Sequence, residues 1–245
     1  MTNPIGIDFG GSGIKAAPVD LAAGDFAAGR VRIPTPARST PEAVAEVMVE
    51  LVANFPDATG PVGVAIPGVV RSGVVWSAAN IDKGWIGTDA DALLTDRLGR
   101  DVHVVNDADA AGVAELRYGA ATGRTGLVIL TTLGTGIGSA LLYDGTLVPN
   151  SELGHLEIEG HVAEKRAAAS IRTSENLSWP EYAARLTTYY RTLEQLFSPD
   201  LIVVGGGISK DAAQFLPLLQ IDTEIVPATL RNRAGIIGAA VITTG

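Results

Sequence analysis

The chain contains no cysteine at any of its 245 positions. Disulfide bonds and zinc sites with thiolate ligands are therefore excluded, because both need cysteine sulfur. Histidine is scarce too, and of the three copies neither His103 nor His161 lies in a motif that indicates a role.

Positive charge is also scarce. The formal net charge is −9, and the lysines are Lys15, Lys83, Lys165 and Lys210. General nucleic-acid binding needs a basic surface, so this balance argues against a nucleic-acid partner. The sequence also lacks a charged-then-apolar leader and an apolar run of membrane-spanning length. These absences predict a cytoplasmic protein without a membrane partner.

Glycine is plentiful, and two glycine-rich stretches stand out. They are Asp8-Phe9-Gly10-Gly11-Ser12-Gly13-Ile14-Lys15 and Leu133-Gly134-Thr135-Gly136-Ile137-Gly138-Ser139. Each is flanked by apolar residues that predict strands, and successive N–H groups in such a turn can bind an anion. A tight hairpin explains either stretch alone. Two equivalent turns, one in each half, favour a duplicated fold that grips a phosphoryl donor from both sides.

Neither turn fits the commoner phosphate-binding motifs. Ala16 follows Lys15 where a P-loop needs serine or threonine for magnesium. Ser139 stands where the dinucleotide fingerprint needs its last glycine. The sequence therefore indicates a phosphate-binding fold of another kind.

The order of predicted elements repeats in the two halves. Apolar runs predict strands at 4–9, 14–19, 29–33, 62–66, 102–105, 127–133, 139–143 and 201–204. Helices are predicted from Thr40, from Thr88, through Ala110, after a capping box at Ser178 and Glu181, and after a cap at Ser209. We predict an α/β fold with an N-terminal domain over 1–116 and a C-terminal domain over 117–233. A terminal helix over 234–245 is expected to pack back on the first domain.

This arrangement resembles the sugar kinases of the actin, hexokinase and Hsp70 superfamily, and within it the ROK family (repressors, open reading frames and kinases). Besides the two glycine turns, the resemblance rests on Ile66-Pro67-Gly68, Asn80 with Trp85, Asn106-Asp107, Glu152-Leu153-Gly154-His155 and Val203-Val204-Gly205-Gly206-Gly207-Ile208-Ser209. It implies a two-lobed, actin-like (ribonuclease H-like) α/β fold with an interdomain cleft. It also implies a Mg²⁺-dependent kinase that forms a homodimer.

One departure from the ROK pattern narrows this expectation. Most members carry a cysteine-rich zinc motif after the Gly-His pair, whereas the equivalent stretch here, residues 156–166, contains no cysteine. In this respect the chain is similar to the polyphosphate glucokinases, a zinc-free branch that phosphorylates glucose from inorganic polyphosphate and sometimes from ATP. A strictly ATP-dependent hexose or N-acetylhexosamine kinase stays open as an alternative. A sugar-sensing repressor is disfavoured, because it needs a helix-turn-helix before a phosphate strand that begins here at about residue 4.

The resemblance implies three glycine segments for the donor. The implied donor-binding residues are Asp8, Gly10, Gly11, Ser12, Gly13, Lys15, Gly134, Thr135, Gly136, Gly138, Gly205, Gly206 and Gly207. Asp8 is expected to act on Mg²⁺ through water, because this ion usually keeps several waters. For Lys15, a place near the donor phosphates and a plain surface position are weighed equally. A polyphosphate donor further implies a basic track, with Lys165, Arg166, Arg172, Arg231 and Arg233 as candidates.

Asp107 is the predicted general base for the sugar hydroxyl. It follows a predicted buried strand beside Asn106, where ligand sites gather in open α/β sheets. Capping of the following helix is the alternative explanation for this pair. The implied sugar-binding residues are Gly68, Asn80, Asn106, Asp107, Glu152, His155 and Glu164. We expect a carboxylate or backbone carbonyl to orient the ring of His155, and Trp85 to serve packing.

Overall fold

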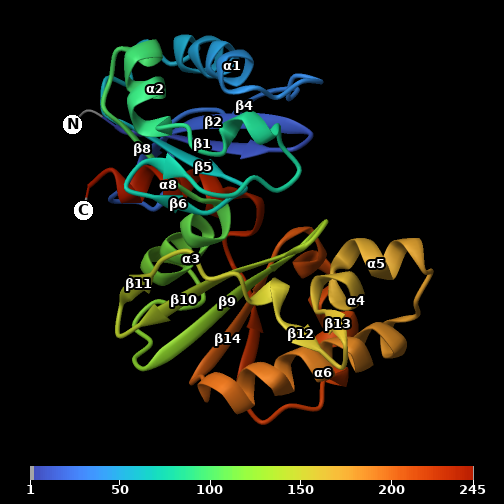
Figure 1. Cartoon of the computed structure of the whole chain (residues 1–245). Helices are drawn as coiled ribbons and strands as arrows, with labels where there is room; N and C mark the ends of the chain where they lie inside the picture. The colour runs from blue at the N-terminus through green and yellow to red at the C-terminus, as the bar shows by residue number, and fades with distance from the viewer. Residues whose placement is uncertain (1–2, 245) are drawn as a thin grey trace. The chain divides into compact units, whose positions relative to one another are not determined.

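The computed structural model describes residues 3–244, which fall into two compact units. Unit 1 comprises residues 3–114 and 233–244, and unit 2 comprises residues 115–232. Each unit is built on a mixed sheet with helices, so the predicted α/β class is confirmed (Figure 1). Among residues 3–244, no helix combines the length and apolar character needed to cross a bilayer.

The sheet of unit 1 starts from a hairpin and continues with parallel strands. Its strands are β1 (Ile5–Gly10), β2 (Gly13–Asp20), β3 (Asp25–Phe26), β4 (Val31–Ile33), β5 (Val62–Ile66) and β8 (Val102–Asn106). Their order is β3-β2-β1-β5-β8, with β4 also paired to β2. β1 and β2 are antiparallel, whereas β1, β5 and β8 run parallel. A separate small hairpin joins β6 (Val70–Arg71) to β7 (Val74–Val75).

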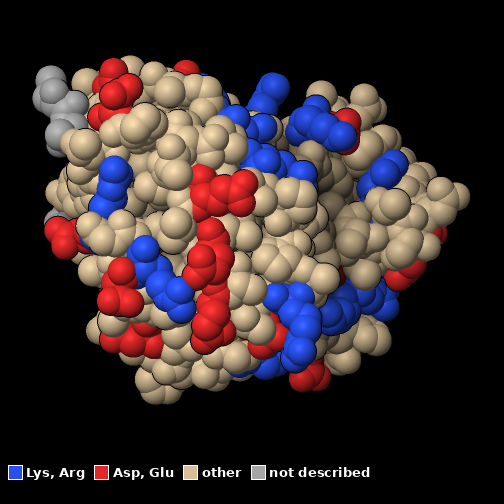
Figure 2. Space-filling model, turned by 90° about the horizontal axis from the view of Figure 1, so that it is seen from above, with Lys and Arg blue, Asp and Glu red and all other residues tan. Residues whose placement is uncertain are grey.

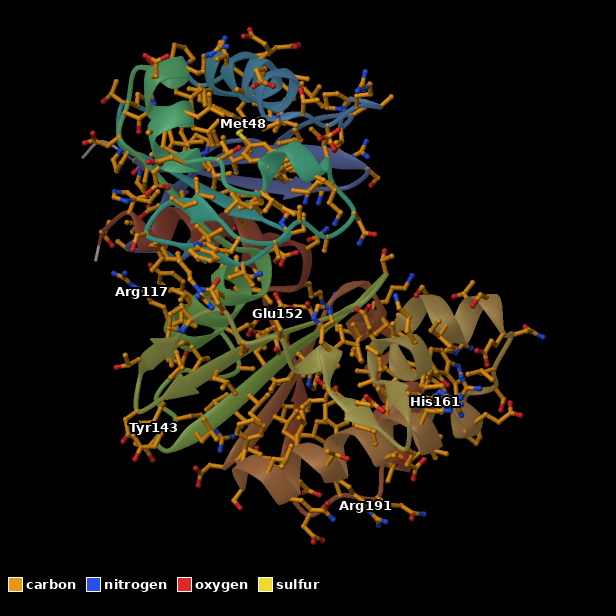
Figure 3. All side chains as sticks on the ribbon, viewed as in Figure 1. Met48, Arg117, Tyr143, Glu152, His161 and Arg191 are labelled. Carbon is orange, nitrogen blue, oxygen red and sulfur yellow. The ribbon has the colours of Figure 1, made fainter. Side chains whose placement is uncertain are left out.

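Helices cover both faces of this sheet. They are α1 (Pro41–Ala53), the single turn η1 (Lys83–Trp85), α2 (Ala90–Leu98), the start of α3 (Asp107–Tyr118) and α8 (Ala234–Ile242). α1 and α2 lie on one face and α8 on the other (Figure 1). From α1 the buried Met48 points toward the sheet (Figure 3). α8 approaches the strands closely, because Gly6 and Gly63 have no Cβ to collide with backbone carbonyls of the helix.

Local capping signals set several helix ends. Thr40 caps α1 as predicted, since its hydroxyl accepts a hydrogen bond from the Ala43 amide. α2 begins two residues after the predicted start, because Asp89 rather than Thr88 accepts from the Ala92 amide at 2.9 Å. The predicted capping box of Ser178 and Glu181 is confirmed at the start of a long helix in unit 2.

Unit 2 repeats the sheet plan of unit 1. Its strands β9 (Leu127–Leu133), β10 (Ile137–Tyr143), β11 (Thr146–Val148), β14 (Leu201–Gly205) and β15 (Ile225–Pro227) have the order β11-β10-β9-β14-β15. Here too a hairpin, β9 with β10, is followed by parallel strands, since β9, β14 and β15 run the same way. A two-stranded hairpin pairs β12 (Glu157–Ile158) with β13 (His161–Val162). The repeated order fits the predicted duplication.

Short helices dominate the rest of unit 2. They are η2 (Leu153–His155), α4 (Glu164–Ala167), α5 (Ala169–Ser174), α6 (Trp179–Phe197), η3 (Gly207–Asp211), α7 (Ala212–Phe215), η4 (Leu216–Leu218) and η5 (Arg231–Arg233). α6 buries the face that carries Tyr182, Leu186 and Tyr189 against the sheet. The predicted cap at Ser209 is wrong: this residue lies inside η3, and its hydroxyl donates to the Gly206 carbonyl at 2.8 Å.

Candidate active site

In unit 1 the predicted site residues gather at one edge of the sheet. Carboxyl ends of neighbouring parallel strands meet at the same edge, which is where ligands bind in open α/β sheets. β1 ends there at Gly10, β5 leads to Gly68, and β8 leads from Asn106 to Asp107. The Asn106 side-chain amide donates to the Gly68 carbonyl at 3.1 Å. The fold thus brings donor and sugar candidates of this unit to one edge.

The first glycine turn joins β1 to β2 through Gly11 and Ser12. Side chains hold its carbonyls: the Thr35 hydroxyl donates to Gly10 at 2.6 Å, and the Arg32 guanidinium donates to Ser12 at 2.7 Å. Within residues 3–244, the amides of Gly11 and Ser12 donate no hydrogen bond. Two N–H groups of the turn are therefore available to an anion.

A row of charged side chains crosses the strands behind this turn. Asp8 on β1 stands opposite Lys15 on β2, which in turn stands opposite Arg32 on β4. The Lys15 ammonium lies 2.8 Å from the Asp8 carboxylate, and both side chains are about a quarter exposed, at 27% and 22%. Lys15 is therefore a partly buried ion-pair partner rather than a plain surface residue. Its contact with donor phosphates stays a prediction.

Arg32 is a site residue that sequence reasoning missed. Its guanidinium lies over Gly13, where a Cβ would require this side chain to shift. The predicted strand over 29–33 was the available signal. Its antiparallel register with 14–19, which the sequence did not specify, is what places Arg32 beside the first glycine turn.

Asn106 is the residue that caps α3, and Asp107 follows it. The Asn106 side-chain oxygen accepts from the amides of Ala108 and Asp109, at 2.9 and 3.0 Å, and so caps α3. Asp107 is the half-buried first residue of α3, and its Oδ1 accepts from the Ala108 amide at 2.9 Å. The capping alternative therefore applies to Asn106. Asp107 as general base stays a prediction.

Asn80 lies beside the first glycine turn. Its carbonyl oxygen is 3.4 Å from the position that a Cβ on Gly11 would take. Asn80 has a φ of 60°, a left-handed conformation that asparagine tolerates better than most residues. Trp85, by contrast, is only 1% exposed and donates from its indole to the Ser39 carbonyl at 2.9 Å. Its predicted packing role is confirmed.

The edge of unit 2 carries the second glycine turn, Gly134 to Gly136, at the carboxyl end of β9. Ser170 of α5 holds the turn, because its amide donates to Gly134 at 3.0 Å and its hydroxyl to Thr135 at 2.7 Å. Over the described part of the chain, the amides of Thr135 and Gly136 donate no hydrogen bond. This turn therefore offers an anion two N–H groups as well.

The other predicted donor-binding glycines of unit 2 lie outside the second glycine turn. Gly138 lies inside β10 opposite Thr132 rather than in the turn, so its amide belongs to a strand. Gly206 follows β14 with a φ of 81°, and a Cβ there would collide with the backbone of Leu133. The segment Gly205 to Gly207 is thereby placed against the end of β9, next to the turn.

Glu152, His155 and Glu164 are the predicted sugar-binding residues of this unit, two carboxylates and one imidazole. The Glu164 carboxylate accepts from the Ile137 amide at 3.4 Å and fills the space beside Gly136 that a Cβ would need. Burial raises the pKa of Glu152, nearby Glu164 raises it further, and His155 opposes the rise. The His155 ring is 62% exposed, with Nδ1 3.9 Å from Glu152. That is too far for a hydrogen bond, so the expected orientation of this ring by a carboxylate is wrong in this structure.

Two serines that sequence reasoning did not place in the site position Glu152. The buried Ser139 hydroxyl lies 3.0 Å from that of Ser151 and accepts from the Leu153 amide at 2.9 Å. The Ser151 hydroxyl donates to the Ser139 carbonyl at 2.9 Å. These bonds tie the segment before η2 to β10 and hold Glu152 at the edge.

Three of the five candidates for a basic track have other partners. Lys165 lies 3.0 Å from Glu164, the Arg172 guanidinium stacks 3.6 Å above the Trp179 ring, and Arg233 pairs with Asp25 at 2.7 Å in unit 1. On the face drawn in Figure 2, lysine and arginine side chains form separate groups. A track for polyphosphate stays a prediction.

The sequence pattern of the ROK family matches residues 4–170. The chain belongs to the ROK family. Among its relatives, the polyphosphate glucokinase of Mycobacterium tuberculosis (strain CDC 1551 / Oshkosh) is 50% identical over 236 residues, covering 96% of this chain and 89% of that protein. The polyphosphate glucokinase of Mycobacterium leprae (strain TN) is 47% identical over 240 residues, covering 98% and 74%.

Solved structures of ROK proteins are similar over the whole chain. The inorganic polyphosphate/ATP-glucomannokinase from Arthrobacter sp. strain KM matches with a TM-score of 0.95 and 56% identity, covering 100% of this chain and 99% of that one. A ROK family glucokinase from Streptomyces griseus, solved with glucose and AMPPNP, matches with a TM-score of 0.83 and 25% identity, covering 98% of each chain. The fold of this ROK protein is therefore the actin-like α/β fold of the sugar kinases.

Proposed function

We propose that this ROK protein is a glucose kinase that transfers a phosphoryl group to the 6-hydroxyl of glucose. Inorganic polyphosphate is the proposed donor, with ATP as a second donor. The relatives of 47–56% identity are named for polyphosphate, and one of them also for ATP. A strictly ATP-dependent kinase is the alternative, and the glucokinase solved with AMPPNP supports it at only 25% identity.

The observation that carries the proposal is that both glycine turns leave two amides without an acceptor among residues 3–244. Gly134 shows why this matters. Its φ is not left-handed, and a Cβ on it would meet no atom within 4 Å. Neither backbone conformation nor packing therefore requires glycine there. Glycine there leaves room for a ligand to approach the backbone closely.

Asp107 is the proposed base of the transfer. Its carboxylate takes the proton of the sugar 6-hydroxyl while that oxygen attacks the terminal phosphorus of the donor. The bond from this phosphorus to its bridging oxygen breaks, and the shortened chain leaves with the electron pair. Such a base contributes roughly 10²–10⁴ in rate, and preorganised N–H groups around the phosphoryl group add electrostatic stabilisation.

Carboxylates and amides suit the hydroxyls of the sugar ring. Glu152 and Glu164 accept hydrogen bonds only, whereas Asn80 and Asn106 can accept and donate. The side-chain amide of Asn106 already bonds to the Gly68 carbonyl, and its oxygen to the first amides of α3. Its contribution is therefore to fix the backbone of the site. A site of this kind rejects analogues that lack a hydroxyl, because a buried polar group is then left unpaired.

Mg²⁺ is the proposed metal, and Asp8 is the residue that fits it. Within residues 3–244, no group of three or more acidic or histidine side chains is arranged to hold a metal ion. Mg²⁺ in kinases needs no such group, since donor phosphates, waters and one or two carboxylates complete its shell. The Asp8 carboxylate is partly exposed and uses Oδ2 for Lys15. Bound Mg²⁺ would neutralise charge on the donor phosphates.

The deciding experiment is glucose 6-phosphate formation with Mg²⁺, comparing kcat/KM for polyphosphate and ATP in parallel. We expect the larger value for polyphosphate. Activity with ATP alone would contradict the proposed donor and favour an adenosine site at Gly205 to Gly207. Glucose binding without turnover from either donor would contradict the kinase and favour a sugar sensor.

We also propose a homodimer and a cytoplasmic location, which the ROK resemblance and the sequence composition support. Light scattering coupled to gel filtration measures the mass of the assembly directly against the 25.3 kDa chain. A mass of one chain at working concentration would contradict the dimer. Cell fractionation tests the location.

A further inference from the structure

Unit 2 contains a pocket that none of the proposed base, metal-binding or sugar-binding residues lines, although Arg166, a candidate for the polyphosphate track, does. It lies between the β12–β13 hairpin, α4 and α6, and its volume is about 60 Å³. From α6 it is lined by Arg185, Thr188 and Tyr189, which are three and four residues apart and so share one helix face. His161 of the hairpin, labelled in Figure 3, also lines it.

Tyr189, which lines the pocket, carries an unusual hydroxyl group. Tyr189 is 1% exposed, and its hydroxyl has no hydrogen-bond partner within residues 3–244. The neighbouring tyrosines differ, since Tyr182 donates to the Ala167 carbonyl at 3.0 Å and Tyr190 pairs with Thr131 at 2.9 Å. Buried polar groups are almost always paired, so this one needs a partner that the chain does not supply. Burial raises the pKa of Tyr189, so the hydroxyl stays protonated and can donate.

Two guanidinium groups line the same pocket. The Arg185 side chain is 21% exposed, pairs with Glu175 at 2.6 Å and donates to the Arg166 carbonyl at 3.3 Å. The Arg166 guanidinium makes no hydrogen bond or ion pair within the described residues, although its charge acts on Glu175. Glu159 is the acidic lining residue, and it sits at the exposed hairpin turn. Arg166 is exposed as well, whereas Arg185 is 21% exposed and Tyr189 is buried, so the two deepest of these polar groups are donors.

The pocket is separate from the second glycine turn. α4 is a single helical turn in which Glu164 faces Ile137 of the turn region. Arg166 follows two residues later, which is about 200° around a helix of 3.6 residues per turn. The two side chains therefore leave α4 on opposite sides, one toward the glycine turn and the other toward the pocket.

We propose that this pocket binds a small oxyanion of the phosphate class, held by the guanidinium groups of Arg166 and Arg185 and by the hydroxyl of Tyr189. Guanidinium forks and a hydroxyl donor match the acceptor oxygens of phosphate and need no acceptor in return. The oxyanion is either free orthophosphate or one phosphoryl unit of a polyphosphate chain. The free-phosphate case is independent of the proposed kinase reaction, whereas the polyphosphate case rests on the proposed donor.

Tyrosine NMR on the full chain tests the site at its own position. The chain has five tyrosines, and the resonance of Tyr189 is the one absent from Tyr189→Phe. Titration with sodium phosphate at constant ionic strength is expected to shift this resonance saturably, while sodium chloride does not. Tripolyphosphate is the second arm: a shift with it alone assigns the site to a chain segment, and a shift with both assigns it to free phosphate. No saturable shift with either ion overturns the proposal.

Charge variants separate the pocket from general attraction of anions. Arg166→Gln is expected to raise the apparent Kd about tenfold, the loss expected for one charged hydrogen bond. Arg191→Gln is the matched control, since Arg191 is on the same helix, donates to the Gln220 carbonyl and lies away from the hairpin of His161 (Figure 3). Equal effects of the two variants would overturn the assignment.

Thermal unfolding measures phosphate binding independently of enzyme activity. Without phosphate, Tyr189→Phe is expected to match or exceed the Tm of the wild type, because it removes an unpaired buried hydroxyl. With phosphate, the wild type is expected to gain more in Tm than the variant, since a ligand of the native state stabilises it. A lower Tm of Tyr189→Phe in phosphate-free buffer would mean that a structural water already satisfies the hydroxyl, and the proposal would fail.

Discussion

The two glycine turns occupy the same place in their sheets but are supported by opposite charges. The first has two residues and is backed by the cationic side chains of Lys15 and Arg32. The second has three residues and is held by Ser170, with the Glu164 carboxylate against it. Both leave two amides without an acceptor in the described part of the chain. What they share is the backbone, and what differs is the charge around it.

This difference indicates a division of work between the units. An anion at the first turn gains from nearby positive charge, whereas at the second turn it depends on N–H groups alone. The carboxylates of Glu152 and Glu164 in unit 2 repel an anion but suit sugar hydroxyls as acceptors. We infer that unit 1 carries the base and most of the charge recognition, and that unit 2 contributes backbone donors and sugar acceptors.

The largest expected effect is on the base in unit 1. Asp107→Asn is expected to lower kcat by roughly 10²–10⁴ and to leave the KM for glucose nearly unchanged, because the amide cannot take the proton. The fold should persist, since Asn106 caps α3. Steady-state kinetics measure both constants, and Asp101→Asn, an exposed residue just before β8, is the control. Near-normal turnover of Asp107→Asn would remove it as the base.

The next effect concerns the backbone of the second turn. Gly134→Ala is expected to raise the KM for the donor about tenfold, because the new methyl group occupies the space into which a phosphate must come. Its Tm should match the wild type, since a Cβ there meets no atom. Gly29→Ala is the matched control, as a Cβ there also meets nothing. An unchanged donor KM would show that this turn does not bind the donor.

A smaller effect is expected from the charge at the first turn. Arg32→Gln should raise the KM for polyphosphate about threefold to tenfold and weaken its dependence on salt, because exposed charges act through a screened field. Arg38→Gln removes the same charge from an exposed side chain six residues further on. Kinetics at several salt concentrations compare the two. Equal effects would mean that Arg32 acts only through net charge and not through the turn.

The smallest effect is a shift in pH dependence from unit 2. Burial holds the pKa of Glu152 above 4.5, so kcat/KM for glucose should rise with pH through that raised value as the carboxylate ionises. Glu152→Gln should remove this limb from the pH profile and raise the KM for glucose. A profile that is identical in the variant would exclude Glu152 from sugar binding.

The same raised pKa has a consequence for stability. A carboxyl group whose pKa is higher in the folded state contributes stability that is fully present below about 4.5 and lost as pH rises through the folded value. Glu152→Gln should therefore be at least as stable as the wild type at neutral pH. Thermal unfolding at pH 4 and pH 7 measures this difference. A variant less stable than the wild type at pH 7 would show that the ionised carboxylate makes stabilising contacts.

Signals that act over a few residues were predictable from the sequence. The caps at Thr40 and Ser178 are confirmed because a side chain and an amide three residues apart meet whenever a helix forms there. The predicted cap at Ser209 was wrong for an equally local reason. Gly206, three residues earlier, has a positive φ that leads the chain into η3, and the Ser209 hydroxyl bonds to the Gly206 carbonyl instead. Gly138 was grouped with the turn, but pairing with β9 puts it in a strand.

The sequence by itself determined the chemistry that is available: no thiolate, scarce positive charge, alternating apolar strands and helices, and two glycine turns at strand ends. Only the tertiary structure decided which side chains meet those turns. Arg32 reaches Gly13 through the register of β4, and Glu164 reaches Gly136 through a helix 27 residues away from Ile137. It also left the Tyr189 hydroxyl buried with no hydrogen-bond partner among the residues that the structure describes. Register and packing between distant segments depend on the whole core, and no local pattern encodes them.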